Sequence, residues 1–262
     1  MIADQIANQT KAQPEPVALF VSDTHLNPSL PKTTEAFLHF LRHHAKHVGS
    51  LYLLGDLFEY WAGDDNMDDP YNRSIVDALL AVHEHGVKLY WIAGNRDFLV
   101  SDDFADATGA QLLPDPSIIE LGSRKTVITH GDALCTDDLA YMAFRQQVRQ
   151  AEWKKNFLSM PLEQRKQIIE GLRNESKKEQ QHKSMEIMDV NSNAVEQLFT
   201  ESGTELMIHG HTHRPAIHAM NGKIRHVLPD WDCDTGSPRG GWLAAFADGS
   251  LLRYQWNGAS EL

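Results

Sequence analysis

"LYWIAGNRDF", residues 89–98, is an apolar run that stops at a glycine and continues at once into asparagine, arginine and aspartate. Four other apolar runs of the chain end in a similar way. They are "VALFVSDTHL" (17–26), "SLYLLGDL" (50–57), "KTVITHGD" (125–132) and "TELMIHGHTH" (204–213). Short apolar runs bounded by glycine are typical of buried strands. We therefore expect five strands that each end in polar side chains.

Helical patterns separate the first of these strands. Residues 31–48 place Pro31 where a first helical turn accepts it and gather apolar side chains on one face, and a second helix is expected in 71–85. After residue 216 the chain alternates apolar and polar residues up to 256, which predicts short antiparallel strands. Strands that alternate with helices early and form hairpins late predict an α/β fold layered around buried sheets.

The composition limits the class of protein. The 262 residues carry a net charge of −12, which gives no support for a nucleic-acid partner. Cys135 and Cys233 show no paired spacing, which excludes a disulfide framework and fits a reducing compartment. Residues 1–16 are polar and lack the apolar core of a signal peptide. We expect a cytoplasmic protein with a flexible leader, 1–16, before one domain, 17–262.

Residues 139–183 differ from the rest of the chain in charge. They contain ten lysines and arginines against five glutamates, a net charge of +5, while the remainder carries −17. Their apolar residues have helical spacing and include Trp153, Phe157, Leu158, Met160, Ile168, Ile169 and Leu172. This pattern predicts a helical insertion. An ordinary amphipathic helix packed on the core is the alternative that the pattern alone favours.

The polar residues after the five strands are of the kinds that bind metals. They are Asp23, His25, Asp56, Asn95, His130, His209, His211 and His213. Ligands of α/β sheets bind at the carboxyl ends of strands, so we expect these side chains to converge. Carboxylate, imidazole and one amide oxygen, without thiolate, suit Mn²⁺, Fe²⁺ or Zn²⁺. With one shared carboxylate, three carboxylate or amide groups and four histidines fill two four-ligand sites. Two ions ~3.5–4 Å apart are suited to displacement at phosphorus.

Each of these residues also has an ordinary explanation. An aspartate after a strand commonly caps a helix or forms a turn, and a lone histidine commonly lies at the surface. That explanation weakens when five separate segments each supply such a group. By contrast, His39, His43 and His47 recur along one helix face without carboxylates, and we expect them to be solvated. His83 and His85 lack the His-Glu-x-x-His spacing and are treated alike.

In their order along the chain, "DTH", "GDLFE", "GNRD", "THGD" and "HGHTHRP" resemble the motifs of the calcineurin-like metallophosphoesterase superfamily. The resemblance runs from about residue 17 to the tail and implies a two-sheet β-sandwich flanked by helices. It implies one metal held by Asp23, His25, Asp56 and His213. It implies a second held by Asp56, Asn95, His130 and His211, with Asp56 bridging. His209 matches no ligand and is expected to support the site.

Arg96 stands where most members of the superfamily have a histidine. An arginine hardly gives up a proton, but it can bind phosphate oxygens with two hydrogen bonds. Such a site favours a leaving group that needs no proton. An alkoxide needs one, whereas a phosphate monoester, with a second pKa of about 6, does not. Arg96 therefore predicts cleavage of a phosphoanhydride.

"GDLFEYWAGDD", "AGNRDF", "HGDALCTDDLAYMAFR" and "IMDVNSNAV" resemble, more narrowly, the UDP-2,3-diacylglucosamine hydrolases of lipid A biosynthesis. The resemblance implies two Mn²⁺ ions and attack of water at the α-phosphorus, which gives UMP and 2,3-diacylglucosamine 1-phosphate. It implies a peripheral position on the cytoplasmic face of the inner membrane, and a helical lid at about 137–200 that receives the acyl chains. Asn95 and Arg96 would be catalytic. The substrate contacts it implies are Asn95, Arg96, Asp138, Tyr141, Ser176, Lys183 and His211.

Two other functions stay open from the sequence. One is a pyrophosphatase for another nucleotide conjugate, such as a CDP-alcohol or ADP-ribose, which needs no apolar lid. The other is a binding module that keeps the fold without metals. The presence of every motif ligand argues against the binding module.

Overall fold

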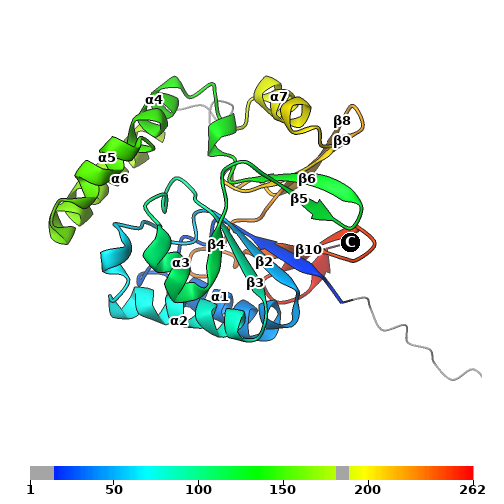
Figure 1. Ribbon diagram of the computed structural model, residues 1–262, viewed down its shortest axis with the longest axis horizontal. Helices are drawn as coiled ribbons and strands as arrows, with labels where there is room; N and C mark the ends of the chain where they lie inside the picture. The colour runs from blue at the N-terminus through cyan, green and yellow to red at the C-terminus, as the bar shows by residue number, and fades with distance from the viewer. Residues whose placement is uncertain (1–14, 181–188, 262) are drawn as a thin grey trace, which may run out of the picture.

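The apolar runs expected as strands form the middle of two β-sheets packed face to face (Figure 1). The computed structural model describes residues 15–180 and 189–261. In the seven-stranded sheet, β1 (Ala18–Val21), β2 (Ser50–Leu54), β3 (Lys88–Ile92) and β4 (Ala110–Leu112) run parallel. β10 (Gly241–Ala245), β11 (Leu251–Gln255) and β12 (Ser260–Glu261) continue it antiparallel beyond β1.

The second sheet has the order β5-β6-β7-β9-β8. β6 (Arg124–Thr129), β7 (Leu206–His209) and β9 (Lys223–Val227) are parallel, and β5 (Ser117–Leu121) and β8 (Ala216–Met220) close its edges antiparallel. The expected short strands after residue 216 are thus β8 to β11, shared between both sheets.

Helices cover the outer faces of both sheets, so the fold is an α/β sandwich as expected (Figure 1). α1 (Pro31–His43), α2 (Pro70–Glu84) and α3 (Asp102–Thr108) pack on the first sheet, and α7 (Ser192–Ser202) packs on the second. α1 and α2 both begin at a proline, whose fixed φ suits a first helical turn. The chain after α1 forms a 3₁₀ turn, Ala45–His47, and His39, His43 and His47 are exposed as expected.

Buried apolar side chains fill the space between the sheets. Phe20, Tyr52 and Tyr90 stand side by side on β1, β2 and β3, with ring centroids 4.8 and 4.7 Å apart. Ile128 of β6 and Ile208 of β7 belong to the same buried cluster from the opposite sheet. This packing fixes the two sheets against each other, and it thereby fixes where their strands end.

Three helices of the expected insertion lie beyond the sandwich, over one end of the sheets (Figure 1). They are α4 (Leu139–Val148), α5 (Ala151–Leu158) and α6 (Leu162–Gln180). Phe157 of α5 and, partly buried, Trp153, Ile168 and Ile169 pack against the large apolar cluster of the first sheet. None of the helices described, across 15–180 and 189–261, has the length and apolar character needed to cross a membrane.

Candidate metal centre and active site

The carboxyl ends of β1, β2, β3, β6 and β7 meet at one end of the sandwich. Backbone hydrogen bonds join neighbouring strand ends: Asp23 N donates to Gly55 O at 3.1 Å, and Gly210 N donates to His130 O at 3.0 Å. One further bond crosses between the sheets, from His211 N to Asp23 Oδ2 at 2.9 Å. All seven residues proposed as ligands from the sequence therefore lie in one region.

Asp23, His25 and His213 form the first cluster, with ligand atoms that all lie within 4.8 Å of one another. The Nε2 atoms of the two histidines are 3.1 Å apart, and Asp23 Oδ1 is 3.5 Å from His213 Nε2. Asp23 Oδ1 is buried and has no hydrogen-bond partner among the described residues. Two imidazole nitrogens and an unpaired carboxylate oxygen that face one another fit a divalent cation.

Asp56, His130 and His211 form the second cluster, also within 4.8 Å. Asn95 Oδ1 lies 3.0 Å from His130 Nε2 and adds an uncharged oxygen to this group. His130 Nδ1 is 2.8 Å from Leu54 O, and since a carbonyl only accepts, this nitrogen carries the proton. Because Nδ1 is engaged by Leu54 O, Nε2 is the nitrogen that His130 would offer to a metal.

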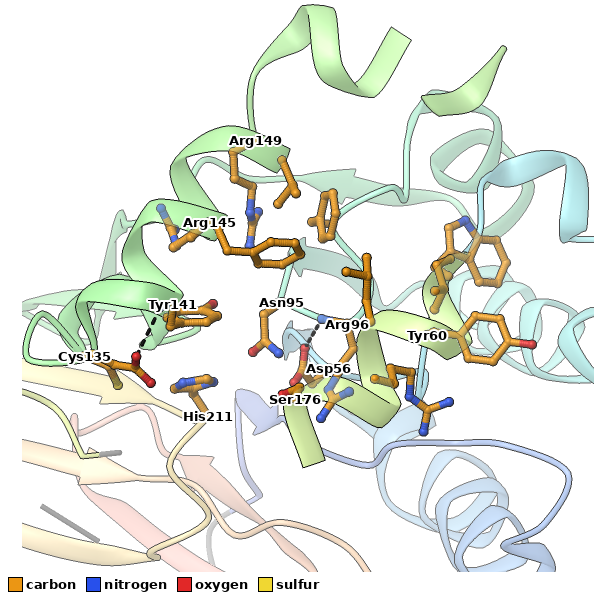
Figure 2. Close-up of a pocket in the computed structure, with 18 of the residues that line it drawn as sticks. Asp56, Tyr60, Asn95, Arg96, Cys135, Tyr141, Arg145, Arg149, Ser176 and His211 are labelled. Atoms are coloured by element: carbon orange, nitrogen blue, oxygen red, sulfur yellow. Dashed lines mark hydrogen bonds between the residues drawn. The ribbon is translucent and has the colours of Figure 1, made fainter. Parts of the chain in front are cut away.

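Asp56 faces both clusters. Its Oδ1 is 3.6 Å from His130 Nε2, and its Oδ2 is 4.0 Å from His25 Nε2. Oδ1 also accepts a hydrogen bond from the backbone N–H of Arg96 at 2.8 Å, which orients the carboxylate (Figure 2). The family resemblance and the two clusters together support a dinuclear metal site.

The backbone at the candidate ligands is unusual. Five of them have positive φ angles: Asp23 (54°), His25 (46°), Asp56 (54°), His211 (70°) and His213 (54°). Among the described residues that are not glycine, Asn221 in a turn is the one other case. A left-handed backbone is disfavoured for residues with a Cβ, and such strain gathers at functional sites. The surrounding structure therefore imposes the direction of these side chains.

Two glycines allow the loops to approach this closely. A Cβ on Gly94 would collide with the carboxylate of Asp56, and one on Gly210 would collide with that of Asp23. The glycines that follow or precede the apolar runs are thus explained by the close packing of loops from different strands.

Asp97 fixes two of these loops and was given no role from the sequence. It is fully buried, and its two oxygens accept from Gly94 N and Leu57 N, both at 2.8 Å. Burial and the nearby charge of Asp56 raise the pKa of Asp97 to about 6. The signal in the sequence is its place in "GNRD", a carboxylate that closely follows a strand end.

His209 lies at the end of β7 but outside both clusters. Its Nδ1 donates to Gly210 O at 2.8 Å, and its Nε2 accepts from Arg225 at 2.9 Å. Burial and the charge of Arg225 lower the pKa of His209 to about 3, so the ring is neutral. Its nitrogens are engaged within the fold, as in a residue that supports the site.

The remaining histidine nitrogens of the first cluster face carboxylates that the sequence reasoning also missed. Glu59 Oε2 is 3.0 Å from His25 Nδ1, and Asp230 Oδ2 is 3.5 Å from His213 Nδ1. Burial alone would raise the pKa of Glu59, but the hydrogen bond with His25 and the surrounding cations lower it to about 2. Carboxylates behind metal-binding histidines orient the ring and make it more basic. Glu59 closes the motif "GDLFE", which was its only signal.

A cavity of about 710 Å³ extends from the clusters into the space under the insertion (Figure 2). Typical small-molecule sites have roughly 300–1,000 Å³. Its apolar lining, which we call the apolar end, is formed by Trp61, Phe98, Leu99, Phe144, Val148, Trp153, Phe157, Ile169 and Leu172. The cavity therefore has one end for charged groups and one for hydrocarbon.

The expected substrate contacts fall on this cavity, apart from Lys183, which lies outside the described residues. Asp138 and Tyr141 of the insertion and Ser176 of α6 line it, and Figure 2 shows Arg96 and Asn95 facing the same space. The Tyr141 hydroxyl donates to Asp132 Oδ2 at 2.6 Å. Arg96 Nε is buried with no hydrogen-bond partner in the part of the chain described, which leaves it able to bind an anion.

Cations of the insertion hold it to the sandwich. Arg145 Nε donates to Asp132 Oδ2 at 2.8 Å, and Arg149 donates to Gly94 O at 2.9 Å. Asp132 is buried, which disfavours its charge, but His130 and Arg145 hold its pKa well below the usual range. Further along, Lys154 donates to Phe98 O at 2.9 Å. Several positive charges of the insertion thus position helices over the cavity.

The sequence profile of the calcineurin-like phosphoesterases matches residues 17–215. The chain belongs to this family. A UDP-2,3-diacylglucosamine hydrolase of Aromatoleum aromaticum is 49% identical over 83% of this chain and 90% of its own length. One of Serratia proteamaculans is 48% identical over 80% of this chain and 88% of its own. In fold, a conserved protein of Streptococcus pneumoniae, described as a phosphoesterase, aligns over 95% of both chains with a TM-score of 0.48 and 13% identity.

Proposed function

We propose that this chain hydrolyses the diphosphate of UDP-2,3-diacylglucosamine at the α-phosphorus and releases UMP and 2,3-diacylglucosamine 1-phosphate. The observation that carries the proposal is the single cavity that joins two ligand clusters, with Asp56 between them, to an apolar end. A substrate with a diphosphate near two acyl chains has this distribution of charge and hydrocarbon. The relatives named UDP-2,3-diacylglucosamine hydrolase support the same assignment.

The ligand assignment follows the two clusters. One metal is held by Asp23, His25, Asp56 and His213, and the other by Asp56, Asn95, His130 and His211. The donor set of carboxylates, imidazoles and one amide, without thiolate, favours two Mn²⁺ ions. Such a pair of ions, when bound, polarises a phosphate and supplies water activated for in-line attack.

Arg96 and Asn95 are the catalytic residues supplied by the chain itself. The Arg96 backbone is fixed by its hydrogen bond to Asp56, and its guanidinium binds oxygens of the α-phosphate, where negative charge builds up during attack. Asn95 Oδ1 lies beside His130 and adds no charge to a site that already holds Asp23 and Asp56. The departing sugar 1-phosphate needs no proton, so Arg96 can stand where an acid would otherwise be required.

The insertion binds the rest of the substrate. Asp138, Tyr141 and Ser176 lie where the polar part of the cavity meets α4 and α6, and Lys183 is proposed to join them on the basis of the sequence alone. The acyl chains pack against the apolar end, where burial contributes roughly 25 cal/mol per Å² of hydrocarbon surface.

Exposed apolar side chains and the positive charge of the insertion favour a peripheral position on the cytoplasmic face of the inner membrane. Leu139 is 78% exposed at the start of α4, and Phe144, Leu158 and Leu172 are also partly exposed on the insertion. These side chains lie among the basic residues of a segment with a net charge of +5, which suits anionic headgroups. The net charge of −12 for the whole chain gives no support for a nucleic-acid partner.

The experiment compares three substrates at saturating Mn²⁺: UDP-2,3-diacylglucosamine, CDP-diacylglycerol and p-nitrophenyl phosphate. We expect the first to have the highest kcat/KM. Preference for CDP-diacylglycerol would indicate a different nucleotide conjugate, and preference for p-nitrophenyl phosphate would contradict the role given to Arg96.

Hydrolysis in water labelled with heavy oxygen identifies the phosphorus that is attacked. Attack at the α-phosphorus places the label in UMP. Label in the sugar 1-phosphate would show attack at the β-phosphorus and would overturn that part of the proposal.

A further inference from the structure

Glu59 lies between the first ligand cluster and the insertion. It follows β2 in the loop "GDLFE", and its backbone N–H donates to Leu26 O at 3.1 Å, beside His25. Its two carboxylate oxygens face different elements. Oε2 is 3.0 Å from His25 Nδ1, and Oε1 forms an ion pair with Arg173 of α6, 114 residues away.

On the cluster side, Glu59 determines how the His25 ring is used. His25 Nδ1 is buried and lies 3.0 Å from Glu59 Oε2, so Glu59 is the carboxylate that favours a proton on this nitrogen. With Nδ1 protonated, the lone pair of His25 Nε2 points toward His213 Nε2, 3.1 Å away. A change in the position of Glu59 therefore turns the ring or favours its proton on the other nitrogen.

On the insertion side, Glu59 fixes the second half of α6. Arg165, near the start of that helix, is buried against Ala62 O and Asp65. Arg173 lies eight residues later, about 12 Å along the helix, and also stacks its guanidinium 5.6 Å over the ring of Tyr60. Between and beyond these two anchors, α6 presents Ile169, Leu172 and Ser176 to the cavity.

His213 offers a comparison within the same cluster, because a carboxylate also lies behind its ring. Asp230, behind His213, accepts a hydrogen bond from Arg239 at 2.9 Å, and both belong to the loop between β9 and β10. That carboxylate connects its histidine to the sandwich, whereas Glu59 connects His25 to a helix of the insertion.

We propose that Glu59 is a positioning residue that couples the seating of α6 over the cavity to the orientation of His25 in the metal centre. This inference rests on the proposed role of His25 as a metal ligand. Because coupling free energies are reciprocal, metal binding at the first cluster stabilises the seated α6, and a seated α6 tightens metal binding.

The first measurement is Mn²⁺ binding by titration calorimetry without substrate. Glu59→Gln keeps the shape of the side chain and removes its charge, and we expect the Kd of one of two Mn²⁺ ions to rise about 10–100-fold. Arg173→Gln touches no candidate ligand, yet it should raise the same Kd at least about fivefold. Glu163→Gln is the matched control, because Glu163 is an 80% exposed carboxylate of the same helix, paired only with Lys166 at 3.6 Å among the described residues.

The second measurement is hydrogen exchange of the amides of residues 162–180 with and without Mn²⁺. In the wild type, Mn²⁺ should slow this exchange, and in Glu59→Gln and Arg173→Gln it should not, while the amides of β1, β2 and β3 stay protected. Unchanged metal affinity and an unchanged response of α6 in both variants would overturn the inference alone. A wild-type chain that bound no divalent metal would overturn the proposed function as well. If Glu59→Gln fails to fold, Arg173→Gln decides the question by itself.

Discussion

The metal end of the cavity and its apolar end are built in different ways. The candidate ligands follow buried strands, five of them have left-handed backbones, and neighbouring glycines leave no room for a side chain. The apolar end is formed largely by α4, α5 and α6, which lie outside both sheets and are held by arginine and lysine contacts to the sandwich. A centre that must place charges accurately is thus built on strand ends of the sandwich. A site for flexible hydrocarbon is built on helices added outside both sheets.

Asp56→Asn is expected to have the largest effect, because it removes a charge that faces both clusters. Activity should fall by about 10³-fold or more, equivalent to ~4 kcal/mol of transition-state stabilisation, and the chain should retain less than two equivalents of manganese. The measurements are kcat/KM and metal content after gel filtration.

Asp77→Asn is the matched control for this change. Asp77 is 63% exposed on α2 and belongs to neither cluster nor the cavity wall, and its weak pair with Arg73 at 3.9 Å contributes little. Full activity of Asp56→Asn with two bound metals would contradict the shared-ligand arrangement.

Arg96→His tests the charge chemistry of the same end. This change introduces the histidine that most members of the superfamily are expected to have at this position. It thereby supplies a group that can donate a proton. We expect kcat/KM for UDP-2,3-diacylglucosamine to fall about 10²–10³-fold, and the ratio of p-nitrophenyl phosphate activity to diphosphate activity to rise. Arg96→Lys keeps the charge but loses the paired hydrogen bonds. Its kcat/KM should therefore lie between those of the wild type and Arg96→His. An unchanged ratio of the two activities in Arg96→His would show that Arg96 does not determine which leaving group is preferred.

The convergence of the candidate ligands could be predicted from the sequence for a physical reason. A strand that ends in glycine and a ligand-type side chain is a local signal, and parallel strands must end at a common edge. The residues from Asp23 to His213 could therefore be collected from five short segments. Their left-handed backbone conformations could not be predicted from the sequence. Those conformations result from contacts between loops, such as that of Gly94 with Asp56.

From the residue pattern alone, the apolar end was predicted only as a helical insertion with excess positive charge, and its role as a lid that receives acyl chains came from the family resemblance. Which cations hold the insertion, and which remain for a ligand, depends on pairs distant in sequence, such as Arg173 with Glu59 and Lys154 with Phe98 O. No periodic pattern encodes such pairs. Likewise, α7 falls within the stretch of 137–200 but packs Val195 and Phe199 on the second sheet. Its amphipathic pattern does not say which surface it covers.

Leu172→Asn tests whether α6 binds hydrocarbon. Leu172 lines the cavity and is 37% exposed, so part of its side chain is available to an acyl chain. We expect KM for the diacylated substrate to rise about tenfold, equivalent to ~1.4 kcal/mol. The effect on UDP-glucosamine without acyl chains should be much smaller. Ile217→Asn is the control, because Ile217 is 62% exposed on β8 and is not part of the cavity wall. Equal losses with both substrates would indicate that Leu172 only packs on the core.

Gly171→Ala should have the smallest effect. The same glycine-to-alanine change at Gly94 allows the apolar end and the metal end to be compared directly. Gly171 lies within α6, is exposed, and has nothing within 4 Å of an added Cβ, so alanine should stabilise the helix by ~0.5–1 kcal/mol. Hydrogen exchange in 162–180 should slow by up to about fivefold. The same change at Gly94 would drive a Cβ into the Asp56 carboxylate, and we expect it to lower the thermal midpoint and the affinity for Mn²⁺. If Gly171→Ala were as damaging as Gly94→Ala, the backbone of α6 would be as tightly constrained as the metal end, and the difference between the two ends would not hold.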